Sequence, residues 1–177
     1  MTTIADKLQQ VQHRVAQACE RAGRDPASVL LLAVSKTFGP DAVLEAARAG
    51  QHAFGENYLQ EAVEKMAALR QMGAPTLQWH CIGPVQSNKT RLVAEHFDWM
   101  HTVDRLKVAQ RLSDQRPAHL PPLQVCIQIN VDGGANKSGV TPQEALALAQ
   151  SVAVLPQLCL RGLMSIPEPA TGFDAQY

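Results

Sequence analysis

Two spacings of hydrophobic residues alternate along the chain. Apolar residues three and four positions apart, such as Ile4, Leu8, Val11 and Val15, predict an amphipathic helix over residues 3–22. Short apolar runs that end at polar residues, glycine or proline predict buried strands. On this basis we expect strands at residues 30–37, 52–57, 77–85, 98–103, 123–131 and 158–166.

Capping residues mark where the later helices begin. The last predicted helix has Thr141 as N-cap, Pro142 at its first position and Glu144 closing a capping box. Asp104 is the expected N-cap of the helix before it. The remaining helices are expected to begin near residues 40, 58 and 87.

The repeated strand–helix order predicts an α/β fold with parallel strands joined by right-handed crossovers. An open doubly wound sheet and a (β/α)8 TIM-type barrel both fit this order. However, no Gly-x-Gly-x-x-Gly follows the first predicted strand, and no P-loop occurs. Polar residues also gather at the carboxyl ends of the strands, where barrels carry their chemistry. We therefore expect a barrel, with residues 1–177 forming a single domain that holds about six of the eight βα units.

Composition and charge narrow the classes of function. Sixteen basic and sixteen acidic residues cancel, so no excess of positive charge favours nucleic-acid binding. No apolar run approaches the roughly 20 residues of a membrane span, and no export signal begins the chain. The six histidines and four cysteines form no metal-binding motif. We expect a cytoplasmic protein with buried, reduced cysteines and no metal, membrane or nucleic-acid partner.

Lys36 is the best-placed candidate for chemistry, because it closes a first strand that we expect to be buried on both faces. Partial desolvation at the end of an apolar strand favours the neutral amine. The neutral amine is the form that reacts with an aldehyde to give a Schiff base. The alternative is a lysine at a strand end that simply lies in solvent.

Asn57 ends the second predicted strand and is a candidate to contact a ligand or to hold Lys36 in place. Gly55 lies within that strand, where a glycine weakens the sheet unless another group approaches its backbone closely. The alternative is that Asn57 caps the next helix. No Gly-x-Ser-x-Gly elbow and no paired carboxylates are evident, so we name no catalytic residue.

Two other segments are candidates for binding an anion. Residues 87–89 open a predicted helix, and helix N-termini attract anions. Residues 136–140 form a loop that begins with Asn136 and Lys137. An ordinary helix start and a solvated turn are the alternatives.

Six motifs occur in order along the chain. They are LLAVSKT (31–37), FGENY (54–58), WHCIGPVQSNK (79–89), TVDR (102–105), INV with KSGV (129–131 and 137–140), and RGLMSIP (161–167). Together they resemble the pyridoxal phosphate homeostasis proteins of the YggS/PROSC type over all 177 residues. The resemblance implies a barrel like the N-terminal domain of alanine racemase. It also implies that pyridoxal 5′-phosphate (PLP) is held as a Schiff base on Lys36, with Asn57 beside the cofactor.

The family is regarded as a carrier or regulator of vitamin B6 and PLP supply, with no established catalytic activity. The resemblance therefore implies a protein that is not an enzyme and that supplies PLP to apo-enzymes, and we expect it to be a monomer. An amino-acid racemase of the same barrel type is the alternative. Racemisation needs a second base opposite the lysine, which in alanine racemase is a tyrosine from a separate β-domain. This chain has only Tyr58 and Tyr177 and no such domain, which disfavours racemisation.

The sequence departs from the family pattern at two places. Cys81 replaces an aromatic residue before Ile82 and Gly83, which we expect to alter packing more than function. The chain also ends at Tyr177, before the family motifs that supply most phosphate contacts. We therefore expect a truncated chain, and we expect longer chains with two more βα units to be more soluble and to bind PLP more tightly.

Overall fold

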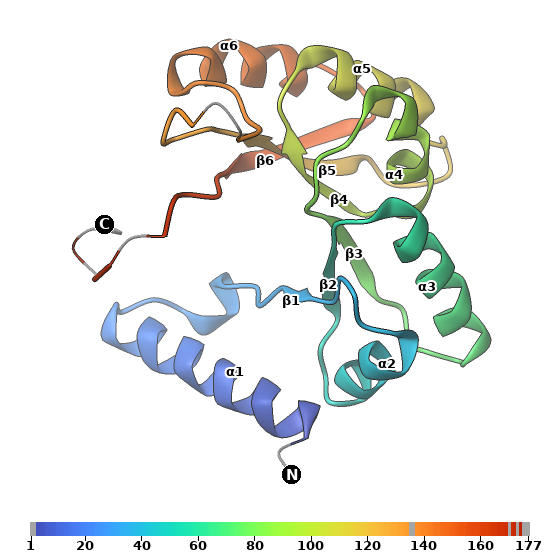
Figure 1. Ribbon diagram of the computed structural model, residues 1–177, viewed down its shortest axis with the longest axis vertical. Coiled ribbons are helices and arrows are strands. Elements are labelled where there is room, and N and C mark those ends of the chain that lie inside the picture. The colour runs from blue at the N-terminus through green and yellow to red at the C-terminus, as the bar shows by residue number, and fades with distance from the viewer. Residues whose placement is uncertain (1–2, 135–136, 170, 173, 175–177) are drawn as a thin grey trace. The chain divides into compact units, whose positions relative to one another are not determined.

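The computed structural model describes residues 3–134, 137–169, 171–172 and 174 (Figure 1). The predictions that concern Asn136 and Tyr177 lie outside these residues. Contacts divide the chain into two compact units. The first comprises Met1–Cys81 and His96–Asp98, and the second comprises Ile82–Glu95 and Trp99–Tyr177. The single domain expected over residues 1–177 stays a prediction.

The first unit is built on three parallel strands, in which β1 pairs with β2 and β2 pairs with β3 (Figure 1). Helix α1 packs against α2, and α2 packs against α3. Large apolar side chains from the helices and strands fill the core, among them Val43, Phe54, Met66 and Trp79. The elements are α1 (Ile4–Arg21), η1 (Pro26–Ser28), β1 (Ala33–Val34), α2 (Pro40–Arg48), β2 (Ala53–Glu56), α3 (Leu59–Gln71) and β3 (Gln78–Cys81).

The second unit also contains three parallel strands, in the order β4, β5, β6. Helix α6 packs against β6 and against α5. Buried apolar residues of the strands form its core, among them Met100, Leu123, Val125 and Ile127. The elements are η2 (Ser87–Lys89), α4 (Thr90–His96), β4 (Trp99–Val103), α5 (Leu106–Gln115), β5 (Leu123–Gln128), α6 (Pro142–Ala153) and β6 (Leu158–Met164).

The alternation of strands and helices is as predicted, but the first strand differs from the prediction. We expected a strand over 30–37 buried on both faces, whereas β1 contains only Ala33 and Val34. Leu30 is 62% exposed and Val34 is 48% exposed. Within the described part of the chain β1 is the end strand and pairs only with β2, so no strand lies along its other edge. A strand with one neighbour is not enclosed as a central strand is.

Other boundaries also differ. The third strand ends at Cys81 instead of residue 85. Pro84 lacks the N–H that a ladder requires, so the strand could not have continued regularly to residue 85. Helix α5 has Arg105 as its N-cap, so the assignment of Asp104 was wrong. The predicted capping box of α6 is confirmed. The N–H of Thr141 donates to Glu144 at 3.0 Å, and the N–H of Glu144 donates to the Thr141 hydroxyl at 3.4 Å.

Two expectations from composition can be compared with the structure. Among the described residues, no helix combines the length and the apolar character needed to cross a membrane. Cys19, Cys81 and Cys126 are buried as expected, whereas Cys159 is only half-buried.

Gly139 brings a loop against the end of β5. Its φ is +121°, and a Cβ built there would lie 2.6 Å from the backbone nitrogen of Asn130. We expect Gly139→Ala to lower the free energy of unfolding by about 2–4 kcal/mol, because it adds a clash to a backbone conformation that L residues avoid. Urea denaturation measures the loss. Gly134→Ala is the control, since its Cβ would lie 3.7 Å from Lys137 and should change stability by less than about 0.5 kcal/mol. Equal effects of the two substitutions would contradict this account.

Candidate functional site

Lys36 lies in a tight turn that follows β1. The N–H of Phe38 donates to the carbonyl of Ser35 at 3.1 Å, so Lys36 and Thr37 are the two central residues of a four-residue turn. Thr37 has φ +67°, in the left-handed region that a β-branched residue rarely adopts. The turn therefore holds a strained backbone immediately after the candidate lysine.

The Lys36 side chain is exposed, which differs from the desolvation we expected. The reason is local: β1 ends at Val34, and the turn carries Lys36 beyond the apolar part of the strand. The Lys36 ammonium makes no hydrogen bond or ion pair with any of the described residues. Lys36 is therefore accessible to a ligand.

Asn57 lies at the corresponding end of β2. The register that pairs Ala33 with Phe54 and Val34 with Gly55 continues through a 2.9 Å backbone hydrogen bond from the Ser35 N–H to the Gly55 carbonyl. The Ser35 hydroxyl also donates to Glu56 Oε1 at 2.6 Å. The residues that come next after β1 and β2 are Lys36 and Asn57. The first unit therefore brings the two predicted site residues to adjacent strand ends.

The Asn57 side chain is half-buried, and its Oδ1 is a buried acceptor without a hydrogen-bond partner in the described part of the chain. The helix that follows has Tyr58 as its N-cap, with no side-chain capping bond. Asn57 therefore does not serve as the helix cap that we considered. A buried acceptor without a donor is costly, and it marks a place where a donor from a ligand would be favourable.

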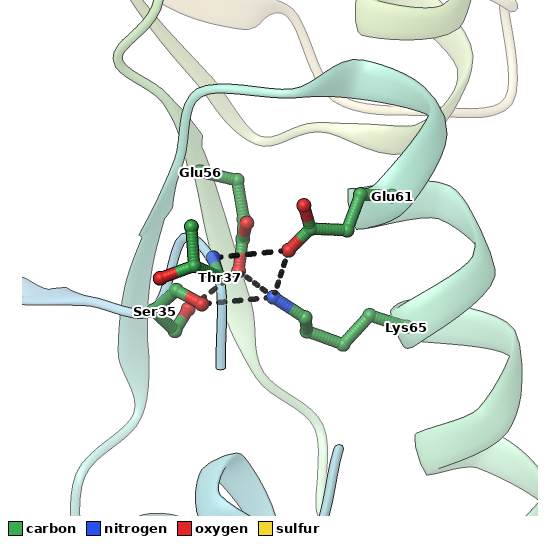
Figure 2. A network of polar contacts seen from close by, with 5 residues as sticks. All are labelled: Ser35, Thr37, Glu56, Glu61 and Lys65. Atoms are coloured by element: carbon green, nitrogen blue, oxygen red, sulfur yellow. Dashed lines mark hydrogen bonds and ion pairs between the residues drawn. The ribbon is translucent and has the colours of Figure 1, made fainter. Parts of the chain in front are cut away.

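A buried ionic cluster lies directly beneath the turn (Figure 2). The Lys65 ammonium, from α3, donates to Glu56 Oε1 at 2.7 Å, to the Ser35 carbonyl at 2.8 Å and to Glu61 Oε1 at 3.2 Å. The Lys65 and Glu56 side chains are 3% and 0% exposed. Figure 2 shows the ammonium surrounded by these acceptors. We call Ser35, Glu56, Glu61 and Lys65 the Lys65 cluster.

The Lys65 cluster holds the backbone on both sides of Lys36. On one side, Lys65 binds the same Ser35 carbonyl that closes the turn. On the other side, the N–H of Thr37 donates to Glu61 Oε1 at 3.1 Å. Each of these hydrogen bonds has a charged partner, and such bonds are stronger than neutral ones.

Sequence reasoning did not find this cluster. One signal was present, since Glu61 and Lys65 are four residues apart on one helix, a spacing that favours an ion pair. A second signal was that Lys65 lies between Ala62 and Met66, on the apolar side of α3. A lysine at a core position requires a buried partner, but neither signal identifies the strand end to which that partner belongs.

The two alternative anion-binding segments gain no support. Residues Ser87–Lys89 form a 3-10 turn, and the helix after them has only seven residues. The Lys137 ammonium lies 2.7 Å from Asp132 Oδ2 and 2.9 Å from Glu168 Oε1. The hydrogen bond to Asp132 raises the pKa of Lys137, and the same bond lowers the pKa of Asp132. Lys137 is thus already paired with two carboxylates.

A pocket of about 190 Å3 lies in the second unit, at the carboxyl ends of β5 and β6. Gln128, Asn130 and Lys137 are among its lining residues. The side-chain oxygens of Gln128 and Asn130 are buried and lack hydrogen-bond partners within the described residues. The polar strand ends expected from the sequence are therefore present in this unit as well.

Comparison with known proteins identifies the family. Residues 7–177 match the model of the alanine racemase N-terminal domain. A pyridoxal phosphate homeostasis protein of Pseudomonas aeruginosa is 59% identical over 177 residues, which are 100% of this chain and 76% of that protein. The protein of the same name from Escherichia coli K12 is 54% identical over the same shares of the two chains. The chain belongs to the alanine racemase N-terminal domain family and, within it, to the pyridoxal phosphate homeostasis proteins.

Solved structures agree with this assignment. PipY of Synechococcus elongatus, solved with PLP bound, is 37% identical with a TM-score of 0.72, and the match covers 89% of this chain and 72% of that one. An alanine racemase of E. faecalis is 23% identical with a TM-score of 0.60, covering 89% of this chain and 41% of the enzyme. The second likeness shows the fold alone. These matches confirm the α/β fold of the alanine racemase N-terminal type, with which a (β/α)8 barrel is consistent.

Proposed function

We propose that this protein binds PLP through a Schiff base on Lys36 and takes part in PLP homeostasis without turning over amino acids. Its relatives at 52–59% identity carry the name of that role. The solved structure of PipY with PLP bound supports the choice of ligand. We further propose that the protein is a cytoplasmic monomer that passes PLP to apo-enzymes.

The observation that carries the proposal is the pair formed by Lys36 and Asn57. Lys36 offers an exposed ammonium that no other described group occupies. Asn57 offers a buried oxygen that lacks a donor. A ligand with an aldehyde and a hydrogen-bond donor fits both groups, and PLP, whose ring carries a hydroxyl and a protonatable nitrogen, is such a ligand.

The cofactor supplies an electrophilic aldehyde carbon. Lys36, in its neutral form, would be the nucleophile that holds this aldehyde as a Schiff base, with water as the leaving group. Asn57 would orient the ligand by accepting a hydrogen bond at Oδ1. Lys36 and Asn57 would thus hold the ligand, and neither group provides a second base.

We expect the loaded protein to show no amino-acid racemase activity. Full-length protein is titrated with PLP until its visible Schiff-base band saturates, and is then incubated with L-alanine. The D-isomer should not exceed that formed by a Lys36→Ala control, because catalysis needs a base on the opposite side of the cofactor. If no band forms, the binding proposal fails. Lysine-dependent racemisation at about 0.1 s⁻¹ or faster would instead contradict the non-catalytic role.

A further inference from the structure

The ion pair at the centre of the Lys65 cluster is buried, whereas the lysine beside which it lies is exposed. Counted over the whole residue, Lys65 is 5% exposed and Glu56 is 0% exposed, whereas Lys36 is an exposed residue. Lys65 also uses its ammonium for three acceptors that come from β2, from α3 and from the residue after β1. A buried charge costs folding free energy unless it is fully paired. Because burying the Lys65–Glu56 pair is costly, the stability of the core alone does not explain why the pair lies at the end of β1.

We infer that the Lys65 cluster positions Lys36 for its reaction with an aldehyde. This inference rests on the proposed function of Lys36. Ser35 and Thr37 flank Lys36 in sequence, and the cluster binds the carbonyl of the first and the N–H of the second. The cluster therefore fixes the direction in which the Lys36 side chain leaves the turn. Glu61 and Lys65 are positioning residues, since they act through the backbone and do not touch the reacting atoms.

Thr37 gives the inference independent support. A threonine at φ +67° is in a conformation that costs free energy and persists only when neighbouring contacts enforce it. The hydrogen bond from its N–H to Glu61 is such a contact. If this bond is weakened, Thr37 is free to return to negative φ. The turn then changes shape, and the amine of Lys36 moves from its reactive position.

Glu61→Gln is the most direct test, because Glu61 is on the outer side of the cluster. Its side chain is 40% exposed, so its neutralisation leaves the buried Lys65–Glu56 pair intact and the protein folded. Two quantities are measured on the full-length protein. One is the rate at which the Schiff-base band appears with PLP. The other is the affinity for pyridoxine 5′-phosphate, which has the same phosphate and ring but no aldehyde.

We expect the rate of band formation to fall roughly tenfold or more in Glu61→Gln, because small displacements of a reacting group have effects of this size. The affinity for pyridoxine 5′-phosphate should stay within about twofold of that of the unchanged protein, as should the midpoint of urea unfolding. Glu64→Gln is the matched control, since Glu64 is an exposed glutamate of the same helix whose side chain bonds only to Gln60 among the described residues. Glu64→Gln should change neither the rate of band formation nor the affinity for pyridoxine 5′-phosphate.

The double substitution Glu56→Gln with Lys65→Met provides a second test. It removes both buried charges together, so no unpaired charge is left in the core. It also removes the hydrogen bond to the Ser35 carbonyl, and the band should again form more slowly while the affinity for pyridoxine 5′-phosphate is kept.

The outcomes separate this inference from the function on which it rests. If the unchanged protein forms no band, the proposed function of Lys36 is wrong. If it forms the band and Glu61→Gln forms it within twofold of the same rate, only the positioning role is wrong. An equal fall in the rate and in the affinity for pyridoxine 5′-phosphate would also overturn the inference, because the cluster would then shape the whole pocket.

Discussion

Replacement of Lys65 by methionine is expected to lower the free energy of unfolding by about 3–5 kcal/mol, the usual cost of removing one partner from a buried ion pair. The methionine fills a similar volume, so little of this loss comes from a cavity. The loss comes instead from Glu56, whose side chain is 0% exposed. In the unchanged protein its Oε1 accepts hydrogen bonds from Lys65 and from the Ser35 hydroxyl, and the substitution leaves this buried carboxylate without its cationic partner. Urea denaturation followed by circular dichroism measures the change.

Two variants make this prediction specific. Lys7→Met replaces an exposed lysine of α1 in the same unit and should change stability by less than about 0.5 kcal/mol. The double substitution of Glu56 by glutamine and Lys65 by methionine should regain much of the loss, since it leaves no unpaired buried charge. A Lys65→Met protein as stable as the Lys7→Met protein would show that the ion pair contributes nothing to the fold.

Lys36→Ala is expected to abolish the visible Schiff-base band and to weaken PLP binding at least roughly tenfold, or 1.4 kcal/mol. The reason is that this substitution removes the amine that forms the C=N bond and touches little else. Lys36 is exposed and makes no described hydrogen bond, so the stability of the protein should hardly change. Absorption spectroscopy and a PLP titration of the full-length protein measure the two effects.

The control for this prediction is Lys7→Ala, an equivalent loss of an exposed lysine amine. It should keep both the band and the affinity. A Lys36→Ala protein with an unchanged band would mean that another lysine carries the cofactor. Lys89 and Lys137 would then be the first to test, because the sequence places both near strand ends.

Local signals were enough to predict most of the elements. The capping box at Thr141 and Glu144 was readable because all its atoms lie within four residues. The same holds for α1, whose apolar spacing fixed both its ends closely. The extent of β1 was not readable, because it depends on which strands lie beside it and not on its own apolar residues. An apolar run shows that a strand suits a buried position, but not that the position is enclosed.

The site was predictable only in the part that depends on local sequence. Lys36 and Asn57 each lie at the end of a segment predicted to be a strand, so their place at strand ends followed from the sequence alone. Their expected roles came from the resemblance to a family. The Lys65 cluster could not be predicted, because Lys65 and Ser35 are 30 residues apart and meet only when α3 packs beside the end of β1. The exposure of Lys36 was missed because a three-residue difference in the end of the strand, Val34 instead of Thr37, decides it.

The most direct measurement of the central claim is the position of the bound cofactor on the chain. Full-length protein loaded with PLP is reduced with borohydride, which converts the C=N bond into a stable secondary amine, and its peptides are mapped by mass spectrometry. We predict that the pyridoxyl group is found on Lys36. A pyridoxyl group found mainly on Lys89, Lys137 or any other lysine would contradict the account.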